Sequence, residues 1–380
     1  MGSKNNYIIW FGSVFTSDTL MKNTAISPAG NTFQQDFFDN MGGIGVKTIA
    51  IGHCPERVFP FGRLFVNKKN VTTPENARSE LSSYLNLPFI RILIINLLSV
   101  KKLARIIKIE GVKPLYVLSY NTYSYNVAPV LYAKYIRGIK WITIIADPVS
   151  DNTKRINPFN KLADAKMFFS YKLFIEDKSE KKIHFDGAVS KINGMEKKVL
   201  ASNEKIILYA GTIAYHTGVE LLVRAIPFVK SKNLKFIFCG RGKNDILQKA
   251  SNLNKNISFL GLLDEEKLKE LYRNAYVFIN PRLISSETNI SIFPSKLFQY
   301  LSYCKPVIST YTEGIHPYYK EAIQFIYQDD PQILANKIDE VVAWDENIYL
   351  QVSDSIKSFI EQKKMWPQII KEIHTWALEI

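Results

Sequence analysis

Short apolar runs alternate with amphipathic stretches along most of the chain. Four runs in its first part are bounded by Gly, Asn, Asp or Pro and are rich in β-branched or aromatic residues: 7–11, 46–51, 114–119 and 141–146. Helical periodicity lies between them, at 33–41, 93–109 and 127–135. Buried parallel strands have this short, continuous apolar character. Their alternation with helices predicts a doubly wound parallel sheet of the α/β class.

The same alternation begins again at residue 205. The strands expected there are 205–210, 235–239, 256–260, 276–279, 306–309 and 324–326, with helices at 218–229, 245–252, 264–273, 295–303, 331–342 and 347–361. Residues 147–203 show no clean alternation, and we place the linker at 192–203. The sequence therefore predicts two Rossmann-like domains, 1–190 and 191–362. Ligands of such sheets bind at the carboxyl ends of the strands, so the default site is the cleft between the domains.

Length and composition agree with two globular domains and disfavour several other classes. The chain has 380 residues, of which 47% are hydrophobic and 22% charged. Its three cysteines form no CxxC pair and no two histidines have HExxH spacing, so neither a disulfide framework nor a bound metal is expected. The longest apolar stretch, 87–100, is shorter than the roughly 20 residues that span a bilayer. Since the first residues also form no signal peptide, we expect a cytoplasmic protein.

The formal charge of +14 points to an anionic partner. The candidates are nucleic acid, an anionic membrane and an anionic substrate such as a pyrophosphate. No RNP, zinc-finger or basic-zipper signature is present, and basic residues are interspersed with acidic ones, which disfavours nucleic acid. The apolar segment 89–109 carries five basic residues: Arg91, Lys101, Lys102, Arg105 and Lys108. A basic amphipathic helix can lie on anionic lipid, although a core helix with a solvated basic face fits this pattern equally well.

Two glycine turns open the second domain, each between an expected strand and an expected helix. The first runs from Gly211 to Gly218, and the second consists of Gly240, Arg241, Gly242 and Lys243. Backbone N–H groups at such a junction bind phosphate, glycine lets the backbone approach closely, and the two cations add charge. Neither turn is a complete GxGxxG or Walker A sequence. Each one alone is equally compatible with a purely structural turn.

A third segment combines Asn280-Pro-Arg282 with 293–300 and 305–309. Pro294 suits the start of a helix and Ser295 suits its N-cap or first position. Lys296 then lies in the first turn, where a cation opposes the helix dipole unless an anion binds there. Gln299 lies on the same helical face and is able to hydrogen-bond a ribose or sugar hydroxyl.

These segments together resemble the donor-binding domain of retaining GT-B glycosyltransferases of family 4, particularly the bacterial exopolysaccharide and capsule branch. The similarity spans 205–342, where the family pattern NPR…FPSK…EY…(G/K)PVIST…GIP corresponds to 280–282, 293–296, 299–300, 305–310 and 314–317. The first half is similar only in rhythm, with 27–34 as an acceptor-side loop and helix start. Residues 363–380 correspond to the helix that crosses back to the N-terminal domain in this fold.

The resemblance implies a GT-B fold and metal-independent transfer of a sugar, with retention, from a nucleotide-sugar donor, with a UDP-sugar expected and no further cofactor. It implies a lipid-linked or oligosaccharide acceptor on the N-terminal domain, in cell-surface polysaccharide synthesis at the inner face of the plasma membrane. Lys296 and the backbone at Ser295 would hold the diphosphate, and Gly240–Gly242 would flank the nucleotide. Lys296 and Gln299 are thus candidate catalytic residues. Asp147, after the strand 141–146, is a candidate on the acceptor side, although a strand-end turn residue is the commoner role at such a position.

Several positions depart from the family pattern. The family carries two glutamates eight positions apart, where this chain has Ser291 and Gln299, and Glu287 is out of register. Thr212 replaces an arginine of the first glycine turn. Charge for the leaving diphosphate must then come from other residues, namely His216, Arg241, Lys243, Arg282 or Lys296. Two alternatives follow, a catalytically weak partner subunit and a sugar-nucleotide enzyme without transfer.

Overall fold

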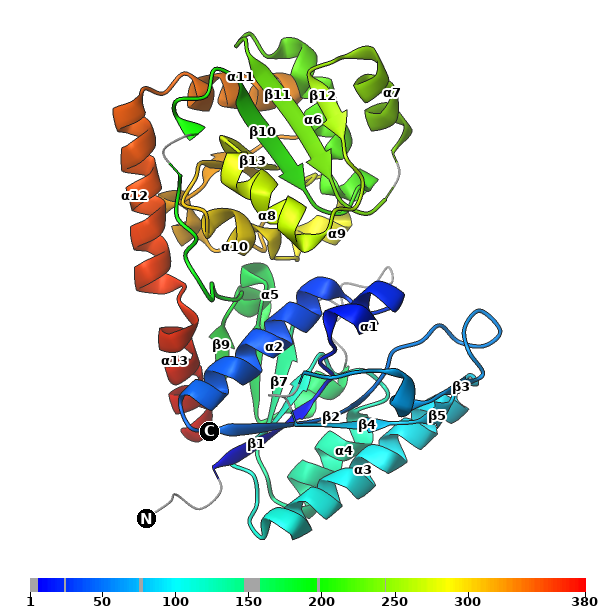
Figure 1. The fold of residues 1–380 in the computed structure, drawn as a ribbon. Helices are drawn as coiled ribbons and strands as arrows, with labels where there is room; N and C mark the ends of the chain where they lie inside the picture. The colour runs from blue at the N-terminus through cyan, green and yellow to red at the C-terminus, as the bar shows by residue number, and fades with distance from the viewer. Residues whose placement is uncertain (1–5, 24, 75–77, 147–157, 197–198, 243) are drawn as a thin grey trace. The chain divides into compact units, whose positions relative to one another are not determined.

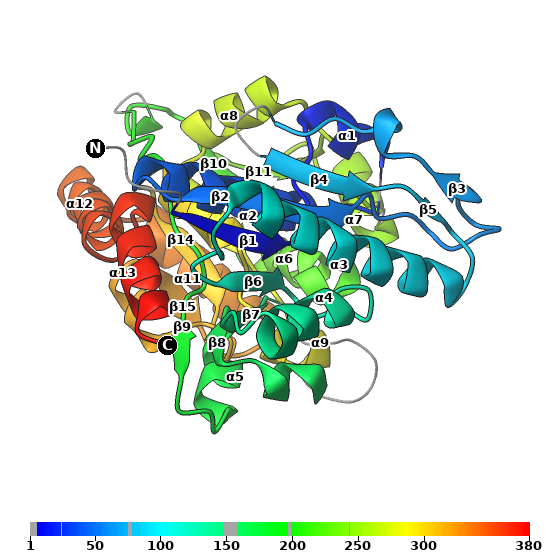
Figure 2. The same ribbon diagram turned by 90° about the horizontal axis from the view of Figure 1, so that it is seen from below.

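The computed structural model describes residues 6–23, 25–74, 78–146, 158–196, 199–242 and 244–380. The chain forms two compact units: the first comprises 1–169, 174–185 and 366–380, and the second comprises 170–173 and 186–365. Each unit is built on its own parallel sheet with helices against it (Figures 1 and 2). The predicted α/β class with two Rossmann-like domains is confirmed. The chain passes between the units at 169/170, 173/174, 185/186 and 365/366. The last two crossings lie a few residues from the boundaries expected at 190 and 363.

The sheet of the first unit has the strand order β4-β2-β1-β6-β7-β8-β9, with every pair parallel. The strands are β1 (Tyr7–Phe11), β2 (Lys47–His53), β4 (Arg78–Ser82), β6 (Val117–Tyr120), β7 (Trp141–Ile145), β8 (Ala165–Phe168) and β9 (Lys182–His184). A short antiparallel pair, β3 (Phe65–Val66) and β5 (Tyr84–Leu85), lies apart from it. All five residues of β1 are buried, because helices cover both faces of the sheet.

The two sides of β1 pack against different helices. Tyr7, Ile9 and Phe11 share a core with α3 (Ile90–Glu110) and α4 (Val127–Leu131). On the other side, the Trp10 ring lies 4.8 Å from Phe37 of α2 (Pro28–Gly43). The C-terminal helix α13 (Trp366–Leu378) packs on α2 within this unit.

The prediction that 147–203 lacks alternating strands and helices is wrong for part of that region. Strand β8, helix α5 (Tyr171–Glu176) and strand β9 follow one another there and extend the first sheet. These elements were not recognised in the sequence because they contain charged residues. Lys166 is a buried strand residue, and its ammonium lies 2.7 Å from the Asp177 carboxylate. That pairing is visible only in three dimensions.

The sheet of the second unit has the order β12-β11-β10-β13-β14-β15, again entirely parallel. The strands are β10 (Lys205–Ala210), β11 (Leu234–Cys239), β12 (Ile257–Phe259), β13 (Val277–Asn280), β14 (Val307–Thr310) and β15 (Gln324–Ile326). The helices that follow them include α6 (Val219–Ala225), α7 (Asp245–Leu253), α8 (Glu265–Asn274), α10 (Lys296–Leu301), α11 (Pro331–Val342) and α12 (Glu346–Lys363). The order of the strands reverses at β10, which lies between β11 and β13.

A buried ion pair lies in the second unit where the chain passes between the units. The Lys364 ammonium donates a hydrogen bond to the Asp186 carboxylate, and the two side chains are 4% and 0% exposed. The backbone N–H of Val189 donates to the carbonyl of Lys364 at 2.7 Å, so the two crossing segments are also joined through the backbone. Burial lowers the pKa of Lys364. Removing one partner would leave a buried charge without compensation.

We expect Asp186→Asn to lower the free energy of unfolding by about 3–5 kcal/mol, because the buried Lys364 ammonium loses the carboxylate that compensates its charge. Urea denaturation followed by circular dichroism measures this loss. Lys363→Met is the matched control: it breaks the neighbouring pair with Glu321, whose side chains are 37% and 55% exposed. An exposed pair contributes less than about 1 kcal/mol. Equal losses for the two variants would contradict the assigned role of the Asp186–Lys364 pair.

Candidate functional site

Three loops of the second unit meet at the carboxyl ends of its central strands. The turn 211–218 follows β10 and residues 240–242 follow β11. The loop 281–295, which includes the short helix α9 (Glu287–Ile290), follows β13. Because β11 and β13 flank β10, the two outer loops lie on either side of the first glycine turn. In open α/β sheets this point, where the strand order reverses, is where ligands bind.

Glycine is required at this edge for close contact between backbones. Gly240 has φ 139°, and a Cβ atom there would lie 1.7 Å from the carbonyl oxygen of Gly211. Gly218 has φ 74°, and its Cβ would lie 1.6 Å from the carbonyl oxygen of Pro281. Both values are far inside van der Waals contact, so neither position accepts another residue without backbone movement. Glycine is therefore required at both positions for a structural reason that is independent of any ligand.

Helix α10 is attached to the end of β10 through one tyrosine. The Tyr300 hydroxyl accepts a hydrogen bond from the Ala210 backbone N–H (2.9 Å) and donates one to the Ala210 carbonyl (3.0 Å). On the same helix, Lys296 Nζ donates to Gln299 Oε1 at 2.9 Å, and Tyr272 donates to the same oxygen at 3.3 Å. Burial lowers the pKa of Lys296. The carbonyl oxygen of Gln299 is thus engaged, which leaves its amide N–H groups for a ligand.

Two further predicted residues lie where the first glycine turn meets the loop after β13. Asn289 connects the two by donating to the carbonyls of His216 (2.6 Å) and Leu283 (2.8 Å). Arg282 donates to Asn289 Oδ1 at 3.1 Å. Burial and the Arg282 charge lower the pKa of His216, so its imidazole is neutral at neutral pH. His216 then offers hydrogen bonds rather than positive charge.

The structure brings together most of the residues predicted for the donor site. Those that lie on these three loops or on α10 are Gly211, Thr212, His216, Gly240, Arg241, Gly242, Arg282, Ser295, Lys296 and Gln299. The backbone of Ser295 is already helical (φ −53°, ψ −19°) and its side chain makes no capping hydrogen bond, which fits the first-position alternative better than the N-cap. Lys243 and Asp147 lie outside the described residues.

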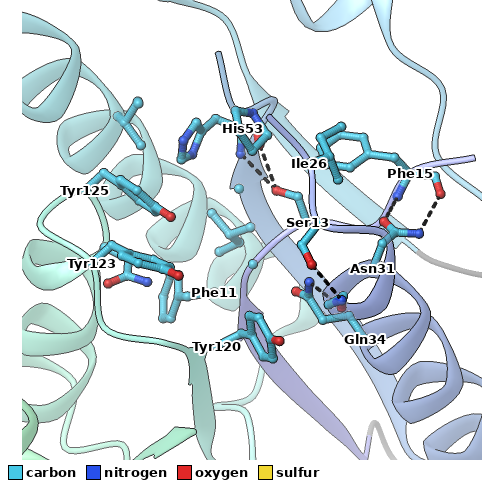
Figure 3. A pocket seen from close by; sticks show the side chains of 18 of the residues that line it. Phe11, Ser13, Phe15, Ile26, Asn31, Gln34, His53, Tyr120, Tyr123 and Tyr125 are labelled. Carbon is cyan, nitrogen blue, oxygen red and sulfur yellow. Dashed lines mark hydrogen bonds between the residues drawn. The ribbon is translucent and has the colours of Figure 1, made fainter. Parts of the chain in front are cut away.

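A pocket in the first unit was not located from the sequence. It has a volume of about 210 Å³ and lies at the carboxyl ends of β1, β2 and β6, beside the start of α2 (Figure 3). Figure 3 shows Tyr123 and Tyr125 on one side, and Asn31 and Gln34 on the other. The helix start at 27–34 was the sequence signal for this place, and the Ser27 hydroxyl does accept from Gly30 N–H at 3.2 Å.

Part of the polar wall is committed to holding the pocket's shape. Asn31 accepts from the Phe15 backbone N–H (2.8 Å) and donates to the Phe15 carbonyl (3.0 Å). Gln34 accepts from Trp10 Nε1 at 2.8 Å and donates to the carbonyl of Gly30 at 3.1 Å. The two amides therefore fix α2 to β1 and to the segment that follows β1.

His53, at the end of β2, is buried in the same wall. Its ring meets that of Tyr125 edge-on, with ring centres 4.5 Å apart. Burial, together with the charges of Arg91 and Lys102, lowers the pKa of His53 to about 4. The imidazole is therefore neutral at neutral pH.

Residues 204–343 match the family model for glycosyl transferases group 1. An uncharacterized glycosyltransferase of Methanocaldococcus jannaschii is 26% identical over 190 residues, which are 48% of this chain and 47% of that protein. The chain thus spans about half the length of this curated relative.

Solved structures of low sequence identity share the fold over nearly the whole chain. A glycosyltransferase from Rickettsia africae has a TM-score of 0.67 at 15% identity, with 99% of this chain and 98% of that chain covered. HepE from Anabaena, solved in complex with UDP and glucose, has a TM-score of 0.68 at 13% identity, with 99% and 100% covered. Sucrose-phosphate synthase from Thermosynechococcus elongatus has a TM-score of 0.68 at 14% identity, with 98% of each chain covered. The fold is therefore that of the GT-B glycosyltransferases.

We expect Gly240→Ala to destabilise the protein by about 3 kcal/mol or more, because the new methyl group displaces the Gly211 turn in addition to straining its own backbone. Thermal unfolding measures the loss. Gly261→Ala is the matched control, since Gly261 also has a positive φ (65°) but no atom lies within 4 Å of its Cβ position. The control should cost only about 1–2 kcal/mol for the left-handed backbone. Similar losses for both variants would show that the close contact at Gly240 is unimportant.

Proposed function

We propose that the protein is a glycosyltransferase that transfers a sugar, with retention, from a nucleotide-sugar donor to a lipid-linked or polysaccharide acceptor in cell-surface polysaccharide synthesis. The observation that carries the proposal is the meeting of two glycine turns, Lys296 and Gln299 at one edge of the second sheet. This edge lies within the segment that matches the glycosyl transferases group 1 model. The Anabaena structure with UDP and glucose supports a UDP-sugar as the donor.

The donor diphosphate is proposed to lie between the glycine turns and α10. Lys296 shares one of its N–H groups with Gln299, so its two other N–H groups are available to phosphate oxygens. Arg241 is exposed on the second turn and adds a second cation. Charges fixed in advance stabilise a departing diphosphate without a metal ion. Gln299 would then donate from its amide nitrogen to a ribose oxygen, where the family's glutamate accepts.

The acceptor is proposed to bind the first unit at the pocket beside His53. Asp147 also remains a proposed acceptor contact, and it lies outside the described residues.

The surface around the start of α3 is proposed to contact an anionic membrane. Its outward stripe begins with Phe89, Leu93 and Leu97, which are 85%, 60% and 54% exposed, and continues to exposed Lys101 and Lys108. Phe61 (83% exposed) belongs to a loop that is held to this helix start, because Asn86 donates to the carbonyls of residues 57 and 63. Apolar groups beside cations suit an anionic bilayer surface.

Two basic residues expected on this surface are used inside the unit instead. Arg91 donates to the Glu56 carbonyl (3.2 Å) and to Asn86 Oδ1 (3.3 Å). Lys102 donates to the Glu80 carbonyl (3.0 Å), and burial lowers its pKa to about 8. The proposed surface therefore rests on fewer cations than the sequence suggested. Among the described residues, none of the helices combines the length and the apolar character needed to cross a bilayer.

We expect UDP to raise the melting temperature, since a ligand that binds only the folded state stabilises it by about 2.7 kcal/mol at 100 times its dissociation constant. Lys296→Ala should weaken UDP binding about tenfold to a hundredfold, because a hydrogen bond from a charged group is lost. Thermal shift with UDP, GDP and dTDP measures both effects. Lys267→Ala, an exposed lysine on α8, is the control and should bind UDP normally. No shift with any nucleotide would contradict the proposal and favour the partner-subunit alternative.

We expect the protein to sediment with vesicles of phosphatidylcholine and phosphatidylglycerol, and less with phosphatidylcholine alone. The double variant Phe61→Ser/Phe89→Ser should bind at least about tenfold more weakly, since each buried phenylalanine contributes about 1.5–3 kcal/mol. Leu253→Ser is the control, because Leu253 is 88% exposed on the second unit. Equal vesicle binding by the double variant and the control would exclude this surface.

A further inference from the structure

The pocket beside His53 is complete within the first unit. Its walls come from the ends of β1, β2 and β6, from α2 and α3, and from the segment 123–126 that precedes α4. The volume of about 210 Å³ is smaller than the roughly 300–1,000 Å³ of sites for drug-sized ligands. The space therefore suits one ring of a larger molecule rather than a whole nucleotide sugar.

One polar atom of the wall lacks a partner. Asn126 is 6% exposed, and its Nδ2 donates to the Asn121 carbonyl at 3.0 Å, which fixes the orientation of the amide. Its Oδ1 is buried and has no hydrogen-bond partner in the described structure. Buried acceptors are nearly always satisfied in folded proteins. A hydroxyl group of a bound molecule would satisfy this one.

Aromatic rings form the side of the pocket next to Asn126. Tyr123 and Tyr125 lie nearly parallel, at 28° with ring centres 5.1 Å apart, and His53 meets Tyr125 edge-on (Figure 3). A wall of aromatic rings with a few fixed polar groups is typical of sites for small organic molecules. A sugar ring matches it, because a sugar has an apolar C–H face and an edge of hydroxyl groups.

No charged side chain lines the pocket. Its described wall contains no Asp, Glu, Lys or Arg, and its one histidine, His53, is neutral at neutral pH. Arg91 and Lys102 act on His53 from a distance, but both already donate hydrogen bonds elsewhere. An anionic group would therefore lose its hydration without gaining an ion pair.

We propose that this pocket holds one uncharged sugar ring, the terminal residue of the acceptor, and that Asn126 accepts a hydrogen bond from one of its hydroxyls. That this sugar belongs to the acceptor rests on the proposed function, whereas the binding of a neutral sugar rests on the pocket alone. A sugar that carries a carboxylate would find no ion-pair partner in this wall, so it would bind more weakly than its neutral counterpart.

The test uses the full chain and saturation-transfer NMR with four probes: the methyl glycosides of glucose and galactose, and those of glucuronic and galacturonic acid. At least one neutral glycoside should bind, and its uronic acid counterpart should bind at least tenfold more weakly (roughly the cost of an uncompensated charge). Asn126→Ala should weaken neutral binding about three- to tenfold through the lost hydrogen bond. Lys267→Ala, an exposed lysine on α8, is the control and should leave it unchanged.

Equal binding of neutral and acidic glycosides, or no binding of any probe, would overturn the inference. So would unchanged binding by a folded Asn126→Ala variant, and if that variant does not fold, the comparison of glycosides on the unaltered protein still decides. Failure of the donor proposal is recognised separately. UDP stabilisation without glycoside binding would contradict only the proposed sugar pocket. Asn126-dependent glycoside binding without UDP stabilisation would contradict only the proposed transferase function.

Discussion

The buried pair of Lys364 and Asp186 lies where two distant parts of the chain leave the second unit. Neither unit is a continuous segment: 174–185 supplies β9 to the first sheet, and 366–380 supplies α13. Both additions begin or end within two residues of this pair. A mispaired crossing would therefore displace an edge strand and a covering helix together. A buried ion pair contributes little net stability. We therefore infer that this pair determines which two segments of the chain lie side by side at the crossing.

The positions of both candidate sites follow from parallel strands. Every strand of a parallel sheet ends at the same edge, so loops that are far apart in the sequence become neighbours there. In the second unit this brings the turn at Gly211 against Gly240 and the turn at Gly218 against Pro281. The tightness of these contacts has a chemical consequence. A loop that cannot shift holds its backbone N–H groups in place before a ligand arrives, which is the requirement for stabilising charge that develops during a reaction.

The sequence revealed what depends on local pattern and missed what depends on distant partners. Continuous apolar runs such as 7–11 and 205–210 identified central strands, because a strand buried on both faces needs no alternation. Strand β8 was missed because its Lys166 is compensated by Asp177, across a helix. Likewise the sequence correctly predicted that Gln299 lies beside Lys296. It did not predict the hydrogen bond from Tyr272 of α8 to Gln299, because the spacing of residues along one helix does not indicate contacts with another. The pocket beside His53 was not located because its wall is formed by residues from five separate elements.

Helix α3 joins the two proposals made for the first unit. Ile95 and Ser99 line the pocket, whereas Leu93 and Leu97 are exposed on the outward stripe. Residues two apart on a helix point in directions about 160° apart, so the same turns of α3 contribute to both faces. If this helix rests on a membrane, the pocket lies one helix diameter, about 10 Å, from the lipid surface. A sugar attached to a lipid through a short phosphate linker remains within reach of that pocket, while its anionic linker stays outside, beside Lys101 and Lys108. If both proposals hold, the neutral pocket would bind the sugar of one acceptor and the basic outer surface would bind its anionic linker.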